Sequence, residues 1–262
     1  MLAEERKKII CEIVNRKKAI RVAELSQRLN ITEATVRRDL DELQKEHKLR
    51  RTHGGAVALY TAGIAGTINT LAGEHLAEKR RIAEKAYEYV YDFDTVLFDG
   101  SSTVLELAYQ LARRNRKGVT VLTNSINVVN VLADKASEGE IKVIQIGGQV
   151  KYHLNSTVGE LAVRTVHDVR VDKTFMGVNG IDVEYGYSIA NMEEAMVKKE
   201  MIHSAKPTFV LADNSKFGKS YLAKITGPEG EIDYLITDSK TDDFDYQQME
   251  EMVHMVYADE GL

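Results

Sequence analysis

The chain has 262 residues, of which 44% are apolar and 29% charged, ordinary values for a folded protein with room for two domains. Its single cysteine, Cys11, excludes an internal disulfide, and the apolar helical pattern around it favours a structural thiol over a nucleophile or metal ligand. No apolar run approaches the roughly 18 residues of a membrane span, and the N-terminus lacks the apolar core of a signal peptide, so we expect a cytoplasmic protein.

The net charge of −5 is unevenly distributed along the chain. Residues 1–57 carry 14 Lys or Arg against 9 Asp or Glu, whereas the remaining residues carry 21 against 31. A small basic head on an acidic body suggests that a polyanion meets the head. Because a surplus of this size also arises by chance on a protein surface, the charge alone does not decide between the two interpretations.

Three short helical patterns lie within the first 46 residues. Apolar residues repeat at three- and four-residue spacing over Ile9–Val14, and a second pattern covers Val22–Leu29. After a break at Asn30, Thr32 supplies an N-cap hydroxyl for a third helix that runs to residue 46. Two helices joined by a tight turn form a helix-turn-helix, whose second helix places its N-terminal residues in the DNA major groove.

The polar residues of the third helix are of the types that read DNA. The candidates in its first two turns are Thr32, Glu33, Thr35, Arg37 and Arg38. Arginine is the residue that pairs bidentately with guanine. The alternative is that both arginines are solvated and paired with Asp41 and Glu42 at i,i+4.

Residues 48–59 predict a two-stranded ribbon, with Arg50, Arg51 and His53 before a Gly-Gly turn. A basic ribbon directly behind a recognition helix is a wing, which lies along the phosphate backbone or the minor groove. Residues 1–58 are therefore predicted to form a winged helix-turn-helix domain. The uncharged, Gly-, Ala- and Thr-rich residues 59–73 are predicted to be a linker.

From residue 74 to residue 262, strand and helix patterns alternate, which favours an α/β domain with a mainly parallel sheet covered on both faces. Strands are predicted at 95–99, 119–123, 141–146, 173–178, 208–213 and 234–238, helices at 74–90, 103–114, 125–135, 159–167, 193–205 and 242–254, and a loop at 147–150.

Small polar residues gather just after the predicted strands, where open α/β sheets bind their ligands. They form the clusters Asp99–Thr103, Thr123–Ser125, Gly147–Gly148, Gly177–Gly180 and Asp213–Lys216. Glycine lets a ligand approach the backbone, and hydroxyls at a helix start bond an anion that the helix dipole favours. One such turn alone is more often a simple N-cap, but five of them, with Lys198 and Lys216 as countercharge, favour an anion site.

Both halves of the chain resemble the DeoR family of bacterial transcriptional regulators. In the head, the resemblance rests on Leu25-Ser26, TEATVRRDL at 32–40, Leu43 and R-x-HGGA at 51–56. In the body, it rests on EKRRIAEKA at 78–86, FDGSST at 98–103, LTNS at 122–125, IGGQV at 146–150, DKTFMGVNGID at 172–182, E-x3-K at 194–198 and LADNSKFG at 211–218. One departure is His47, where family members usually place a glycine.

The resemblance implies a body similar in fold to ribose 5-phosphate isomerase and CoA transferases, and a phosphorylated sugar as effector. Carried over by position, it implies that Ser101, Ser102 and Thr103 grip the phosphate. The pocket it implies also contains Asp99, Gly100, Asn124, Gly148, Asn179, Lys198, Asp213 and Lys216. Because one helix-turn-helix reads only a half-site, we expect a dimer or tetramer on operator DNA.

The fold also raises the alternative of a sugar-phosphate isomerase joined to a DNA-binding head. Isomerisation needs a carboxylate to move a proton. The loop that carries two acids in the isomerase has Met176 and Asn179 here, neither of which is a general base, and Asp182 and Glu184 are expected to face solvent. Because HExxH, CxxC, P-loop and GxSxG patterns are absent, we expect a regulator, a repressor of a sugar-utilisation operon, without cofactor or metal.

Overall fold

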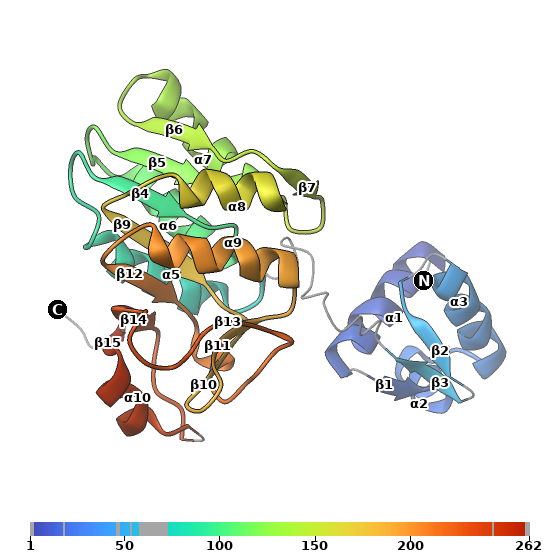
Figure 1. The fold of residues 1–262 in the computed structure, drawn as a ribbon. Coiled ribbons are helices and arrows are strands. Elements are labelled where there is room, and N and C mark those ends of the chain that lie inside the picture. Colours follow the sequence, from blue (N-terminus) through green and yellow to red (C-terminus); the bar gives the residue numbers. More distant parts are fainter. Residues whose placement is uncertain are drawn as a thin grey trace. The chain divides into compact units, whose positions relative to one another are not determined.

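The computed structural model describes residues 3–17, 19–45, 48–52, 54–57, 73–242 and 244–259. Contacts divide the chain into two compact units, Met1–Ala62 and Gly63–Leu262 (Figure 1). Within the described residues, no helix is long and apolar enough to cross a membrane.

The first unit packs three helices against a small antiparallel sheet. The helices are α1 (Ala3–Lys17), α2 (Val22–Leu29) and α3 (Glu33–Lys45), and the strands are β1 (Ala19–Arg21), β2 (Arg50–Thr52) and β3 (Gly55–Val57), with β3 in the centre. The apolar stripes of all three helices close on one core that includes Ile10, Leu25 and Leu40. The three predicted helices and the two-stranded wing are thus confirmed.

Two details of this unit follow from local chemistry. Asn30 ends α2 in the left-handed conformation, with φ of 51°, which asparagine tolerates better than most residues. Strand β1 was not predicted, because three residues between two helices give no periodic pattern. It pairs Ile20 with Ala56 and adds a third strand to the wing.

The second unit is built on a seven-stranded, fully parallel sheet. Its strands are β4 (Thr95–Phe98), β5 (Thr120–Thr123), β6 (Lys142–Gln145), β9 (Lys173–Gly177), β12 (Thr208–Leu211), β14 (Tyr234–Thr237) and β15 (His254–Tyr257), in the order β15-β14-β12-β9-β4-β5-β6. The chain winds outward from β4 to β6 and then from β9 to β15 in the other direction. The strand order therefore reverses between β4 and β9, and such a switch point opens a crevice at the carboxyl ends of the strands.

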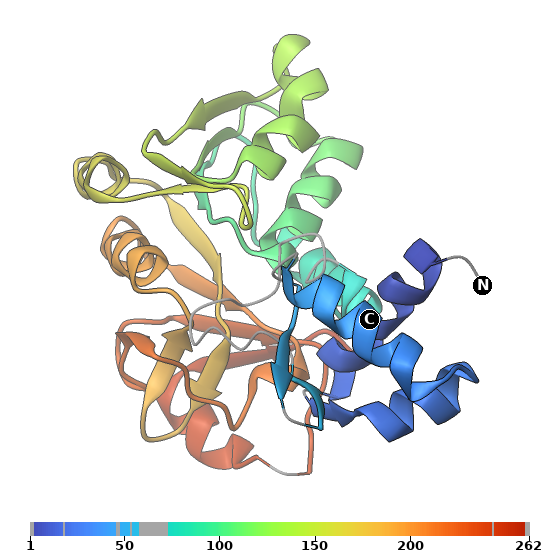
Figure 2. The ribbon, with the colours of Figure 1, turned by 90° about the vertical axis from the view of Figure 1, so that its right-hand side faces the viewer.

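Helices cover both faces of this sheet, as predicted (Figure 2). One face carries α5 (Leu76–Tyr87), α6 (Ser102–Arg113) and α7 (Ile126–Ser137), and the other carries α8 (Glu160–His167), α9 (Met192–His203) and α10 (Tyr246–Met252). Separate apolar clusters fill the two sides, one around Phe98 and Leu107 and the others around Met176 and Val197. The fold class is confirmed.

Several elements of this unit differ from the predictions. Residues 147–150, predicted to be a loop, lead into a hairpin of β7 (Gln149–Lys151) and β8 (Ser156–Val158). The helix predicted at 242–254 is only α10, because the chain continues as edge strand β15. A further antiparallel sheet of β10 (Gly180–Asp182), β11 (Gly186–Ile189) and β13 (Ala223–Thr226) was not predicted. Its strands are short and β11 is buried throughout, so they lack the alternation that marks a half-exposed strand.

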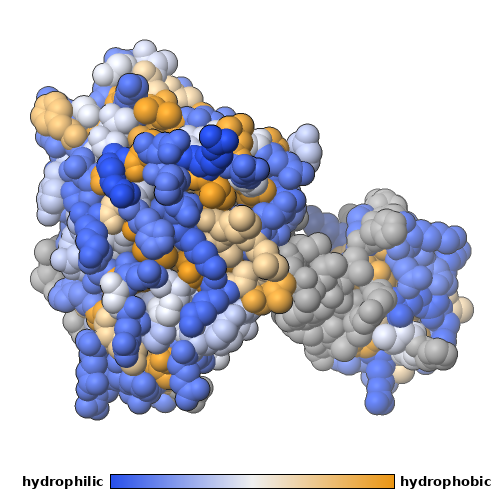
Figure 3. Space-filling model, viewed as in Figure 1, coloured by the Kyte–Doolittle hydropathy of each residue, from blue (hydrophilic) through white to orange (hydrophobic). Residues whose placement is uncertain are grey.

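The surface of the second unit that Figure 3 presents is mostly hydrophilic, with apolar side chains over α8 and α9. They include Leu161, Met192 and Met196, each more than half exposed. Scattered exposed apolar side chains are normal for a protein surface.

Candidate functional site

The interior side of α3 fixes the helix in the head. Thr32 precedes the helix and its hydroxyl oxygen accepts a hydrogen bond from the backbone N–H of Thr35, as an N-cap does. Asp39 is buried and receives two hydrogen bonds, of 2.6 and 3.0 Å, from the Arg6 guanidinium on α1. A bidentate pair of this kind sets orientation as well as distance. The rotation of α3 about its axis is therefore fixed, and so is the face that it presents to solvent.

The two arginines on the exposed face differ in their surroundings. Arg37 forms an ion pair of 3.0 Å with Glu33, one turn earlier. Arg38 is exposed and, within the described residues, has no hydrogen bond or ion pair. The predicted alternative pairing with Asp41 and Glu42 is not what the structure contains. A free guanidinium on the outer face of α3 has its full set of donors available for a base edge or a phosphate.

The two acids that the alternative interpretation paired with these arginines form ion pairs with other residues. Asp41 pairs with Arg51 of the wing at 2.5 Å, and Glu42 pairs with Lys7 of α1 at 2.7 Å. The backbone N–H of Arg51 also donates to Gln44 of α3. These contacts tie the wing to α3.

Other head residues are less fully described. The side chain of Arg50 and the residues His47 and His53 lie outside the described residues.

A hollow of about 630 Å³ lies beside the wing and is lined in part by Arg21, Thr52 and Gly54. Arg21 is exposed and was not among the predicted DNA contacts, because only the pairing of β1 with β3 brings it to the wing.

In the body, Asp99 lies at the switch point, directly after β4. Its side chain is 1% exposed, and its two oxygens accept hydrogen bonds from the backbone N–H groups of Ser101 and Gly177, at 2.9 and 2.7 Å. It also forms a buried ion pair with Lys198 of α9, whose ammonium donates to the Gly177 carbonyl as well. Asp99 thus joins β4, β9 and α9, and the pair leaves no net charge.

Glu194 stands one helical turn before Lys198 and was not among the predicted pocket residues, although it opens the E-x3-K pattern. Burial raises the pKa of its carboxyl group, with a further increase from Asp99 and a partial offset from Lys198. Only the packing of α9 against the sheet reveals this environment, since i,i+4 spacing alone predicts an ordinary surface ion pair.

The FDGSST turn forms the start of α6. Ser101 is its N-cap, and its hydroxyl accepts from the backbone N–H of Val104 at 3.3 Å. Ser102 is half-buried and Thr103 is buried. Among the described residues, none accepts a hydrogen bond from the backbone N–H of Ser102 or Thr103. These two donors, with the positive end of the helix dipole, can bind an anion.

Glycine is needed at position 100 because β8 passes close to the backbone there. A Cβ atom at this position would lie 1.9 Å from the hydroxyl oxygen of Ser156 in β8. The β7–β8 hairpin is therefore seated against the turn. It is held there by Asn124, whose side-chain amide donates to the Thr157 carbonyl at 2.9 Å. The other amide atom of Asn124, Oδ1, is buried without a partner in the part of the chain that the structure describes.

Of the remaining predicted pocket residues, Asp213 and Lys216 follow β12, the strand beyond β9. Gly148 packs beneath the hairpin, close to the Val158 carbonyl. Asn179 accepts a hydrogen bond from the backbone N–H of Ala190, so its carboxamide oxygen holds the β10–β11 region together. The fold brings most of the predicted set to one edge of the sheet, while Gly148 and the Asn179 oxygen have structural roles.

The two positions at which an isomerase would carry acids hold Met176 and Asn179 here, and neither side chain can act as a general base. Met176 is fully buried in the apolar cluster beneath α9. Asp182, which was expected to face solvent, accepts hydrogen bonds from the backbone N–H groups of Glu184 and Tyr185 and so closes its own turn. Within the residues that the structure describes, no group of three or more His, Cys, Asp or Glu side chains could hold a metal ion.

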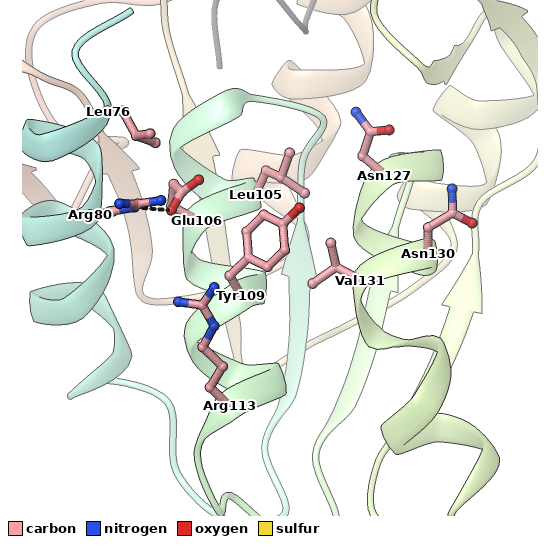
Figure 4. A pocket seen from close by; sticks show the side chains of 9 residues that line it. All are labelled: Leu76, Arg80, Leu105, Glu106, Tyr109, Arg113, Asn127, Asn130 and Val131. Carbon is pink, nitrogen blue, oxygen red and sulfur yellow. Dashed lines mark hydrogen bonds and ion pairs between the residues drawn. The ribbon is translucent and has the colours of Figure 1, made fainter. Parts of the chain in front are cut away.

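A hollow of the body lies away from this edge, between α5, α6 and α7 (Figure 4). It has a volume of about 490 Å³ and is lined by Tyr109 and Arg113 from α6 and by Asn127 and Asn130 from α7. Arg80 crosses to Glu106 at one side. It is an open groove between helices, and it contains neither the free N–H groups of α6 nor Asp99, so the switch point remains the better candidate for an anion.

Comparisons with known proteins match both units of the chain to one family. Residues 6–62 match the DeoR-like helix-turn-helix domain, and residues 74–239 match the DeoR C-terminal sensor domain. The chain is 37% identical over 251 residues to the HTH-type transcriptional regulator YulB of Bacillus subtilis, covering 96% of this chain and 95% of YulB. It is 35% identical to the transcriptional repressor GlcR of the same organism, covering 91% of this chain and 89% of GlcR.

A third relative is a putative aga operon transcriptional repressor of Escherichia coli O157:H7, 30% identical over 89% of this chain and 86% of its own. Among solved structures, a ribose 5-phosphate isomerase of Methanocaldococcus jannaschii superposes with a TM-score of 0.38 at 18% identity, covering 55% of each chain. The curated relatives are regulators, which confirms the expectation of a regulator rather than an enzyme. The chain belongs to the DeoR family of helix-turn-helix transcriptional regulators.

Proposed function

We propose that the protein represses a sugar-utilisation operon and releases its operator when a phosphorylated sugar occupies the switch point of the body. In this proposal α3 and the wing bind the operator. A second copy supplies the other half-site, because one helix-turn-helix reads only one half.

The observation that carries the effector part is that the backbone N–H groups of Ser102 and Thr103 have no acceptor in the described part of the chain. They lie beside an aspartate whose charge Lys198 neutralises, so an incoming phosphate meets donors rather than a net negative charge. The Ser102 hydroxyl lies in the same turn and can add a third donor.

Release of DNA requires that the effector bind one state of the protein more tightly than the other. Asp99 is suited to this role, because it touches the phosphate turn, β9 and α9 through separate hydrogen bonds. A phosphate on the turn changes the electrostatic balance at all three elements.

The test is a DNA-binding assay on the full chain. Fragments of the source genome are selected for binding, and the tightest is labelled and titrated by fluorescence anisotropy with and without pentose and hexose phosphates. We expect at least one phosphorylated sugar to weaken binding by about 5- to 150-fold, the usual range of allosteric coupling, and its unphosphorylated counterpart to have no effect.

Ser102→Glu places a carboxylate in the phosphate position and is expected to abolish this response while leaving DNA affinity unchanged. Ser137→Glu is the matched control, because Ser137 is exposed at the far end of α7. DNA binding that ignores every phosphorylated sugar would contradict the effector assignment. Conversion of a sugar phosphate by the full chain, followed by NMR, would favour the isomerase alternative.

A further inference from the structure

A second group of charged residues lies at the same edge of the sheet, after β12. Asp213 is fully buried; its Oδ1 atom accepts hydrogen bonds from the backbone N–H and the hydroxyl of Ser215. Its Oδ2 atom has no hydrogen-bond partner among the described residues, and the Lys216 ammonium lies 3.6 Å away. A buried carboxylate oxygen without a donor is costly, so a donor from outside the chain is expected at this point.

The surroundings of Asp213 are cationic. Burial by itself raises the pKa of Asp213, yet that pKa lies below its usual range because Lys216, the Ser215 hydroxyl, His75 and Lys79 favour the charged form. Lys79 is itself buried on α5, and burial together with Lys216 lowers its pKa. Both lysines thus act on one buried carboxylate, and the Lys79 ammonium also donates a hydrogen bond to the Glu74 carbonyl.

The other carboxylates near this group lie closer to cations other than Lys216. On α6, Glu106 is paired with Arg80 at 3.3 Å. Beyond β14, the buried Asp238 lies 3.6 Å from Arg81. Glu74 precedes α5, and its charge acts on Lys79. The Lys216 ammonium, in contrast, lies 3.6 Å from Asp213 Oδ2, beyond hydrogen-bond length, and donates no hydrogen bond within the described residues, so it can take an anion.

This group adjoins the phosphate turn. A Cβ atom on Gly177 of β9 would lie 2.5 Å from the Cβ of Ser101 and 3.7 Å from the Leu211 carbonyl at the end of β12. One glycine thus separates the start of α6 from β12. Because β9 lies between β4 and β12, the ends of those two strands are about 10 Å apart.

We infer that the effector is a pentose or hexose derivative with two anionic groups, a phosphate on the α6 turn and a second anion on Lys216. This inference rests on the proposed function and deepens it. A hydroxyl of the sugar beside the second anion donates to Asp213 Oδ2, which supplies the missing hydrogen bond. The second anion is a phosphate or a carboxylate, since both accept hydrogen bonds from lysine in the same way.

The test is isothermal titration of the full chain with four probes: a hexose 1-phosphate, the 6-phosphate, the 1,6-bisphosphate, and the aldonic acid 6-phosphate of the same sugar. A charge-assisted hydrogen bond is worth about 1.5–3 kcal/mol, so at least one doubly anionic probe should bind roughly 10- to 100-fold more tightly than both monophosphates. Which of the two does so identifies the second anion.

Lys216→Met should weaken the binding of the doubly anionic probe at least 10-fold more than that of either monophosphate, while Lys216→Arg should retain part of the difference. Lys219→Met is the control, because Lys219 is an exposed lysine of the same loop. Equal affinities for singly and doubly anionic probes, or equal losses for both in Lys216→Met, would overturn the inference and leave the proposed function intact. If none of the four probes binds and none releases DNA, the effector assignment itself is wrong.

Discussion

On the outer face of α3 the charged side chains lie at the surface and are only partly paired, whereas Asp99 and Lys198, at the carboxyl ends of β4 and β9, are buried and bonded to one another. Arg38 is exposed with no partner in the described residues, while Asp99 and Lys198 are at most 4% exposed and bonded to the backbone as well. The first arrangement suits a large polyanion whose counterions are released on contact. The second suits a small ligand that must be enclosed, because donors gain strength where water is excluded.

The largest effect is expected from breaking the buried pair. Lys198→Met leaves Asp99 charged, buried and without its cation, which typically costs about 3–5 kcal/mol of folding free energy. Lys240→Met removes a lysine from an exposed pair with Glu250 and should cost no more than about 1 kcal/mol. Urea unfolding followed by circular dichroism compares the two, and equal losses would mean that burial of the Asp99–Lys198 pair has no energetic weight.

A smaller effect on the same side of the comparison is expected from Gly177→Ala. The new methyl group would lie 2.5 Å from the Ser101 Cβ, so the α6 turn must shift. Overpacking of this kind usually costs about 1–3 kcal/mol, and we expect effector binding to be lost with the turn geometry. Gly227→Ala is the matched control, because its Cβ would meet open space and neither Gly177 nor Gly227 has a positive φ. Unchanged titration of the effector against Gly177→Ala would contradict the placement of the ligand.

On the exposed side, Arg38→Ala should weaken binding to the operator by about 1–3 kcal/mol and relax the preference for one base pair if Arg38 reads a base edge. If it contacts a phosphate, the loss is uniform across sequences and the salt dependence falls by about one ion. Lys8→Ala is the control, because it removes one exposed charge from α1, outside the helix-turn-helix. Anisotropy at several salt concentrations distinguishes these results. If Arg38→Ala binds the operator as tightly as the unmodified chain does, the proposal that α3 contacts the operator is contradicted.

The smallest expected effect is a change in how folding stability depends on pH. Burial raises the pKa of Glu194 above its usual range in the folded protein. The folded chain therefore binds more protons than the unfolded chain between the two pKa values, and stability falls as the pH rises through that window. Glu194→Gln should flatten this part of the stability profile and gain stability relative to the unmodified chain at neutral pH. Urea midpoints from pH 4 to pH 8 measure this change, and parallel profiles for the two chains would contradict the raised pKa of Glu194.

The head shows how much a local pattern can predict. Each helix there has an apolar stripe at helical spacing, and Thr32 and Asn30 bound the turn by their own conformational preferences, so the sequence alone places α1, α2, α3 and the wing. It does not predict β1, nor that Asp41 pairs with Arg51 rather than with a neighbour on α3. Those contacts join residues that are distant in sequence, and no periodicity encodes them.

The body shows the same division at larger scale. Strand and helix alternation predicts the parallel sheet and gathers Asp99, Asn124 and Asp213 at one edge, because each follows a strand. It does not predict that Asp99 is neutralised by Lys198, 99 residues away, or that Ser101 is occupied as an N-cap. It also misses the short strands β7, β8, β10, β11 and β13, whose partners are set by packing over the sheet rather than by their own pattern.

The amino-acid sequence thus decides which residues are available at the edge of the sheet, since backbone hydrogen bonding and apolar periodicity act over a few residues. The tertiary structure decides which of those residues still have a free donor or acceptor. Among the residues that the structure describes, the backbone N–H groups of Ser102 and Thr103 have no acceptor at the start of α6, and Asp213 Oδ2 has no donor after β12. The physical reason is that each donor or acceptor is satisfied by whichever partner the packing brings within reach, and that partner is often distant in the chain.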